Sequence, residues 1–157
     1  GMRTIPPKAR AGRVIVLDPA TRRCGVAVFV EGVLQSAMTV RAKTTAGVVN
    51  MLGTELARAD SVVIETPVTH KRATARHEDL RGLRVMVRLV RKTATCPVLG
   101  VTPRQWKGNV PKEITAARAL AILSDAERAA IRDDSDDTTD AIGLGLVALT
   151  RAKRGVA

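Results

Sequence analysis

Short apolar runs separated by polar turns recur along the chain, and they predict the strands of a sheet. Two of these runs are joined by Glu31-Gly32, a hairpin signal, because glycine adopts the backbone conformation that tight turns need. The chain therefore opens with an antiparallel meander of three strands, and two further strands follow it. The runs that we expect to form strands are residues 13–18, 25–31, 33–40, 62–65 and 97–101.

Longer segments with apolar residues at helical spacing lie between and after these runs, and they predict helices. The first covers residues 45–59, where Thr44 or Thr45 is placed to cap the first turn. Its apolar stripe consists of Val48, Val49, Leu52 and Leu56. The other segments that we expect to be helical are residues 72–93, 111–123 and 137–153.

The order of these elements indicates a mixed α/β sheet flanked by helices. A helical crossover makes the strands 13–18 and 62–65 parallel, so both end at the same edge of the sheet, where α/β folds bind their ligands. We expect a single domain over residues 13–157, preceded by a flexible basic arm over residues 1–12. Gly1 ahead of Met2 in this arm is typical of the scar that removal of an expression tag leaves.

The charge balance is strongly basic and indicates a polyanionic partner. Lysine and arginine total 26 against 15 acidic residues, a formal charge of +11, which is typical of nucleic-acid-binding proteins. Arginine-rich codon usage remains the alternative explanation. Cys24 and Cys96 are too few for a disulfide framework or a zinc site, so we expect core cysteines. No apolar run is long enough to cross a membrane, and we expect a cytoplasmic protein of a bacterial or phage-infected cell.

Four acidic residues stand at the ends of otherwise apolar segments. Asp18 ends the run 13–18, and Glu65 ends the run 62–65. Asp137 and Asp140 open the last apolar helix, and their spacing of three places both on one helix face. A buried carboxylate is unfavourable unless a positive charge pairs with it. Because hard divalent cations such as Mg²⁺ prefer oxygen ligands, the four acids together predict a metal site.

Each acid also has a structural explanation when it is taken alone. Asp18 before Pro19 suits a turn, and Ser135, Asp136 or Asp137 suits the cap of the last helix. The combination favours metal chemistry, since two cations about 4 Å apart can clamp the attacking water and the leaving oxygen of a phosphodiester. Asp18, central in the sheet, is the candidate that bridges both ions.

The acids belong to longer motifs, and together these resemble a known family. The motifs are Val16-Leu17-Asp18-Pro19-Ala20-Thr21, Gly25-Val26-Ala27-Val28, Val63-Ile64-Glu65 and Asp137-Thr138-Thr139-Asp140-Ala141-Ile142. In order, spacing and element type they resemble the RuvC-type Holliday-junction resolvases of the RNase H-like superfamily, with the compact phage members more similar. The match runs from Arg13 to about Arg151. It implies an RNase H-like five-stranded sheet.

The resemblance also implies an activity and the residues that perform it. Members are Mg²⁺-dependent endonucleases that cut four-way DNA junctions as homodimers, with two ions for which Mn²⁺ can substitute. Carried over by position, the metal ligands are Asp18, Glu65, Asp137 and Asp140. Lysines of the family act on the scissile phosphate, and Lys107 and Lys112 fall in the corresponding stretch. We place Lys112 beside the acids as a catalytic residue, with Lys107 as the alternative. The basic residues that we expect to contact the DNA backbone are Lys71, Arg72, Arg76, Lys107 and Lys112.

Other interpretations stay open at this point. An RNase H-like nuclease acting on flaps, hybrids or structured RNA would need the same acids. A non-catalytic nucleic-acid-binding module would be expected to lack at least one of them, and none is lacking. His70 or His77 could act as a general base, although a metal-bound water needs none. We expect Trp106 to pack against the sheet edge rather than to stack on a base.

Overall fold

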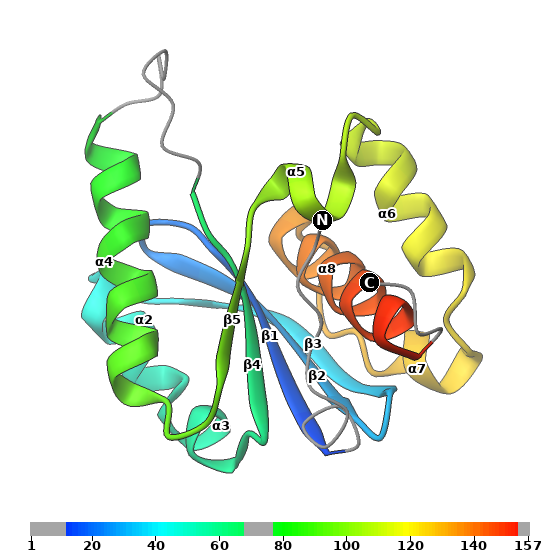
Figure 1. The fold of residues 1–157 in the computed structure, drawn as a ribbon, viewed down its shortest axis with the longest axis horizontal. Coiled ribbons are helices and arrows are strands. Elements are labelled where there is room, and N and C mark those ends of the chain that lie inside the picture. Colours follow the sequence, from blue (N-terminus) through cyan, green and yellow to red (C-terminus); the bar gives the residue numbers. More distant parts are fainter. Residues whose placement is uncertain (1–11, 68–76, 154–157) are drawn as a thin grey trace.

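The computed structural model describes residues 12–67 and 77–153, and a five-stranded sheet forms its centre (Figure 1). The strand order is β3-β2-β1-β4-β5, with the first three antiparallel and β4 and β5 parallel to β1. The predicted mixed sheet is therefore confirmed, and β1 is its central strand. The strands are β1 (Arg13–Pro19), β2 (Arg23–Val30), β3 (Val33–Arg41), β4 (Ser61–Glu65) and β5 (Val98–Val101).

Helices cover both faces of the sheet, as Figure 1 shows. One face carries α2 (Thr45–Met51), α3 (Gly53–Arg58) and α4 (His77–Thr93). The opposite face carries α5 (Pro103–Lys107), α6 (Lys112–Ala121), α7 (Asp125–Ala129) and α8 (Asp136–Lys153). Among the helices of the described ranges, none is long and apolar enough to cross a membrane.

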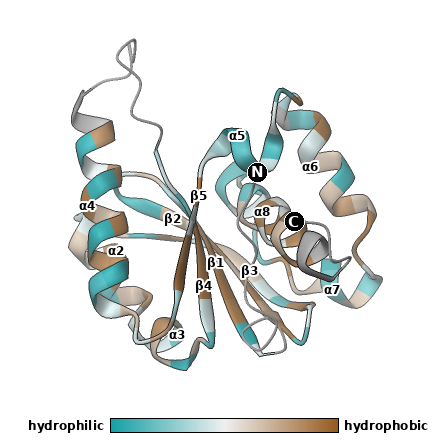
Figure 2. Cartoon of the chain, viewed as in Figure 1, coloured by the Kyte–Doolittle hydropathy of each residue, from teal (hydrophilic) through white to brown (hydrophobic). Residues whose placement is uncertain are grey.

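The alternation of side chains along β1 divides the core into two layers. Ile15 and Leu17 pack with α2, α3 and α4, whereas Val14 and Val16 pack with α8, and all four are fully buried. In Figure 2 the central strands β1 and β4 are brown along most of their length, as expected for strands that are covered on both faces. Because successive residues point to opposite faces, Asp18 lies on the face that α8 covers.

The helix predicted over residues 45–59 is in fact two helices, α2 and α3, which Leu52 separates. The glycine that follows at position 53 favours the break, because glycine is a poor helix former. Thr44 caps α2 as expected, and its hydroxyl accepts a hydrogen bond of 3.0 Å from the N–H of Gly47. The predicted apolar stripe is buried in spite of the break.

Two short helices, α5 and α7, were not predicted. Each begins with a capping box, in which a hydroxyl and a side chain three residues later satisfy each other's backbone N–H groups. These pairs are Thr102 with Gln105 and Ser124 with Glu127. The capping residues were readable in the sequence, but neither segment is long enough to show helical periodicity.

Candidate metal centre

Asp18 and Glu65 lie at the same level on neighbouring strands, at the carboxyl edge of the sheet. The parallel register of β1 and β4 pairs Leu17 with Ile64, so Asp18 and Glu65 are the next residues in the two strands. Each of them stands two positions after a buried valine that packs with α8. The alternation of side chains therefore directs both carboxylates toward α8.

The N-terminus of α8 reaches these acids because Gly25 leaves room for it. Gly25 is paired with Asp18 in the β1–β2 ladder. A Cβ atom at Gly25 would lie 2.0 Å from the carbonyl oxygen of Asp137, closer than any side chain can approach a backbone atom. The first turn of α8 therefore rests directly on β2, which brings Asp137 and Asp140 toward Asp18. This role of Gly25 was not predicted from its position in the sequence motif.

Ser135 provides the cap of α8, so the structure decides between the candidates for that role. The Ser135 hydroxyl accepts a hydrogen bond of 3.3 Å from the N–H of Thr138. The Asp133 carboxylate accepts hydrogen bonds from the Thr138 hydroxyl at 2.6 Å and from the N–H of Thr39 at 2.9 Å. These contacts tie the start of α8 to β3. Asp137 is thus not required as the cap.

Asp18 is the carboxylate on which the other three acids act. Its side chain is buried, with 6% of the residue exposed, and this burial is the main reason why its pKa is raised to about 9. The negative charges of Glu65, Asp140 and Asp137 raise the pKa further, and the positive charge of Lys107 opposes them. A divalent cation would offset both the burial and the mutual repulsion.

Arg23, at the start of β2, contacts one of the acids. Its Nε donates a hydrogen bond to Oδ2 of Asp137, and the two side chains form an ion pair. The arginine side chain is 47% exposed, whereas that of Asp137 is 17% exposed. The sequence alone gives no sign of this role for Arg23, because its contact with Asp137 depends on how α8 packs against β2.

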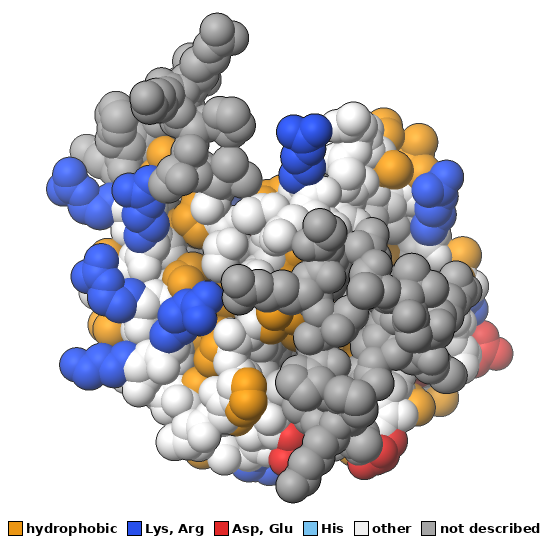
Figure 3. Space-filling view, in the orientation of Figure 1, with side chains coloured by type: hydrophobic (Ala, Val, Ile, Leu, Met, Phe, Trp, Pro, Cys, Tyr) orange, Lys and Arg blue, Asp and Glu red, His pale blue; other side chains and the backbone are white. Residues whose placement is uncertain are grey.

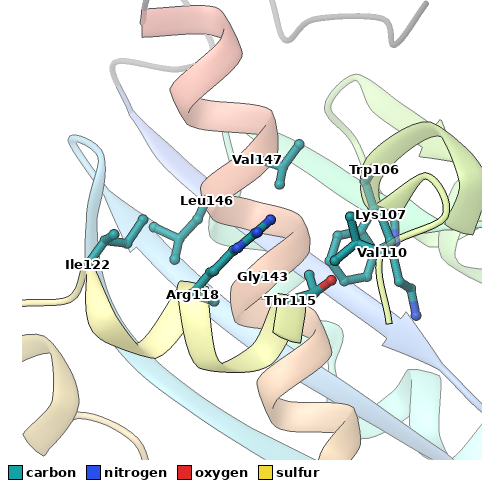
Figure 4. Close-up of a pocket in the computed structure, with 10 residues that line it drawn as sticks. Trp106, Lys107, Val110, Thr115, Arg118, Ile122, Gly143, Leu146 and Val147 are labelled. Carbon is teal, nitrogen blue, oxygen red and sulfur yellow. The ribbon is translucent and has the colours of Figure 1, made fainter. Parts of the chain in front are cut away.

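Trp106, in α5, contacts a second acid. Its Nε1 donates a hydrogen bond of 2.7 Å to Oε2 of Glu65. The ring is buried against α8, where a Cβ atom at Gly143 would lie 3.1 Å from it. In Figure 4 the ring lies beside Lys107 in the wall of an apolar cavity of about 360 Å³ between α5, α6 and α8. Trp106 is a buried packing residue as predicted, but its ring lies against α8 as well as near the sheet edge, and its hydrogen bond to Glu65 was not predicted.

The structure describes only some of the residues that were predicted to contact DNA. Lys107 lies within electrostatic reach of Asp18, and its Nζ lies 4.8 Å from the centre of the Trp106 ring. Lys112 is the first residue of α6, at the start of a helix on the α8 face, and His77 is the first residue of α4. Lys71, Arg72, Arg76 and His70 lie outside the described residues.

A row of basic side chains follows the exposed face of α4 (Figure 3). Its members stand at helical spacing and are Arg81, Arg84, Arg88 and Arg91.

Gly82 lies in this helix at a point of close approach, since a Cβ atom there would lie 2.6 Å from Cγ2 of Thr21. The glycine therefore lets α4 approach the turn between β1 and β2 within the same chain.

The donor set at the sheet edge suits a hard divalent cation. Carboxylate oxygens from β1, β4 and α8 are the ligands that Mg²⁺ prefers. Within residues 12–67 and 77–153, however, no three acidic, histidine or cysteine side chains are already grouped around one point. Asp137 is turned to Arg23, and Glu65 is turned to Trp106.

Comparison with known proteins identifies structures of the same fold. No protein-family model matches the sequence, and neither does any curated protein sequence. RuvC of Thermus thermophilus in complex with a Holliday junction substrate is similar with a TM-score of 0.64 and 20% identity, over 92% of this chain and 98% of that chain. A second RuvC structure from Thermus thermophilus has a TM-score of 0.63, 21% identity and the same coverage.

A eukaryotic structure is similar as well. The yeast mitochondrial Holliday junction resolvase Ydc2 has a TM-score of 0.61 and 11% identity, over 98% of this chain and 84% of that chain. The match thus extends over nearly the whole length of both RuvC structures and over 84% of the yeast structure. These similarities confirm the fold that the motifs predicted, a RuvC-type, RNase H-like sheet with its helices.

Proposed function

We propose that this protein is a divalent-metal-dependent endonuclease that cuts branched DNA, with the four-way junction as its substrate. The observation that carries the proposal is the position of Asp18. It is a buried carboxylate in the central strand, and the charges of Glu65, Asp137 and Asp140 all act on it. The basic net charge of +11 fits a nucleic-acid substrate. The shared fold adds support, because the similar structures are resolvases of Holliday junctions.

Asp18, Glu65, Asp137 and Asp140 are the residues that would hold the metal, with Asp18 between the others. Two Mg²⁺ ions, or Mn²⁺ in their place, supply an activated water and neutralise charge on the phosphate when they are bound. Trp106 orients the Glu65 carboxylate through its 2.7 Å hydrogen bond. Arg23 holds the Asp137 carboxylate through its hydrogen bond and ion pair.

Lysine side chains would interact with the phosphate that is cut. Lys107 lies close enough to Asp18 to affect its pKa, so a phosphate near Asp18 would also feel its positive charge. The position of Lys112 at the start of α6 is compatible with the same role. Lys71, Arg72 and Arg76 follow Glu65 in the chain, and we assign them to the DNA backbone. Paired cuts in the two strands of a junction require two centres, which implies a homodimer.

Cleavage of a panel of labelled substrates tests this proposal. The panel contains a four-way junction, a Y-flap, a linear duplex and an RNA–DNA hybrid, each with Mg²⁺ or with EDTA. We expect paired, symmetric nicks in the junction, and no product in EDTA. If the protein cuts flaps or hybrids in Mg²⁺ but leaves the junction uncut, the metal centre stands and the proposed substrate is wrong. Cutting in EDTA would overturn the metal mechanism.

A further inference from the structure

A second cavity, of about 680 Å³, opens at the same edge of the sheet as the carboxylates. The turn between β1 and β2, the end of β3 and Leu83 of α4 form its walls. Three of its lining residues are arginines, namely Arg22, Arg23 and Arg41, and the described lining contains no acidic residue. The cavity is therefore positively charged and distinct in character from the apolar cavity beside Trp106.

The fold holds these three arginines together against their mutual repulsion. Arg23 and Arg41 are directly paired in the antiparallel ladder of β2 and β3, where like charges are destabilising. The carbonyl oxygen of Arg22 accepts a hydrogen bond of 3.2 Å from the N–H of Ala42, which fixes Arg22 beside them. In the described part of the chain, an ion pair is formed by Arg23 but by neither Arg22 nor Arg41. An anion in the cavity would relieve this repulsion.

The wall of the cavity is held in place by contacts from two other elements. The Thr45 hydroxyl donates a hydrogen bond of 2.6 Å to the carbonyl oxygen of Thr21, in the turn that carries Arg22. Gly82 of α4 also lies against the Thr21 side chain. The backbone of the turn is thus fixed before any ligand arrives, and a ligand would order mainly the exposed arginine side chains.

Arg23 connects the cavity with the carboxylates, since it lines the cavity and also contacts Asp137. An anion bound there would lie next to the proposed metal centre. The guanidinium group forms paired hydrogen bonds with phosphate, which makes arginine the residue of choice for such sites. We propose that the cavity binds a backbone phosphate of the DNA strand, beside the phosphate that is cut. This inference rests on the proposed function and names a second contact of its substrate.

Equilibrium binding of a labelled four-way junction to the full chain in EDTA, over a series of salt concentrations, tests the proposal without cleavage. The variants are Arg22→Ala, Arg41→Ala and the double variant, whereas Arg23 is left intact because it contacts Asp137. Arg58→Ala is the matched control, because Arg58 is exposed at the end of α3, near the opposite edge of the sheet. Thermal unfolding of each variant shows that it is folded.

We expect the slope of log K against log salt to become shallower by roughly 0.9 for each phosphate that a variant no longer neutralises, and affinity to fall with it. Arg41→Lys keeps the charge and should retain most of the slope. If the double variant binds with the slope and affinity of Arg58→Ala, the arginines are solvated surface charges and the inference is overturned. If the wild-type protein binds no branched DNA, the proposed function itself fails, and the phosphate site fails with it.

Discussion

Gly25 lies directly against the backbone of Asp137: a Cβ atom at Gly25 would lie 2.0 Å from the Asp137 carbonyl oxygen. No side chain fits at Gly25 unless the backbone of β2 or α8 moves. We therefore expect Gly25→Ala to displace the start of α8 and to separate Asp137 and Asp140 from Asp18. Overpacking of this kind typically lowers stability by about 1–3 kcal/mol. Misplacement of catalytic groups should lower the cleavage rate more, on the order of 100-fold.

Gly53→Ala is the control for this prediction, because a Cβ atom at Gly53 has no neighbour within 4 Å. Single-turnover cleavage and the free energy of unfolding are measured for both variants. The control should cut like wild type. Wild-type cleavage by Gly25→Ala would show that contact between α8 and β2 does not position the acids.

Asp18 should lower the stability of the metal-free protein. Its pKa is raised from 3.8 to about 9, so the folded state keeps a proton that the unfolded state releases once the pH exceeds 3.8. The free energy of unfolding should therefore fall as the pH rises from 3.8 toward 9. Asp18→Asn cannot release this proton, and in EDTA at neutral pH it should be more stable than wild type. Urea unfolding across pH measures the difference, and a less stable variant would contradict the assignment.

Trp106 should affect metal binding through its hydrogen bond and stability through its ring. Trp106→Phe keeps an aromatic ring against Gly143 but removes the Nε1 donor to Glu65. Partners of metal ligands typically contribute roughly 10–100-fold to metal affinity or activity, and we expect a loss in this range. Mn²⁺ binding by calorimetry and the unfolding midpoint are measured together. Trp106→Ala should also lose about 3–5 kcal/mol of stability, because it leaves a cavity. Unchanged metal affinity in Trp106→Phe would leave the tryptophan with a packing role alone.

Asp133 should stabilise the protein in a pH-dependent way. Burial raises its pKa, but hydrogen bonds from Thr138, Thr39 and Ser135 outweigh this effect and lower the pKa from 3.8 to about 2. Its contribution is therefore fully present above 3.8 and is lost as the pH falls toward 2. Asp133→Asn should be less stable than wild type at neutral pH, with the difference shrinking in acid. The control is Asp125→Asn, which removes the charge of an exposed aspartate that pairs with Arg128 on the surface, and its effect on stability should be small. A pH-independent difference would mean that the carboxylate charge is not what stabilises the start of α8.

The sequence was sufficient to predict the sheet, because its strands are either nearly continuous apolar runs or, in β3, an alternation of apolar and polar residues, and they end at clear turn residues. It was also sufficient to place Asp18 and Glu65 at one edge, since the crossover rule makes their strands parallel. The contacts of Arg23 with Asp137 and of Trp106 with Glu65 were not predictable in this way. They join residues 114 and 41 positions apart, and they depend on how α8 and α5 pack on the sheet.

Cleavage of a labelled four-way junction by wild type and by Asp18→Asn, with Mg²⁺ or with EDTA, shows whether these carboxylates form the metal centre of a nuclease. We expect nicks by wild type with Mg²⁺, none in EDTA, and none by Asp18→Asn, although the variant still binds the junction. Without metal, Asp18 already holds a proton at neutral pH, so Asp18→Asn should bind the junction in EDTA about as tightly as wild type. Cleavage by Asp18→Asn at the wild-type rate would contradict the assignment of these carboxylates as the metal centre.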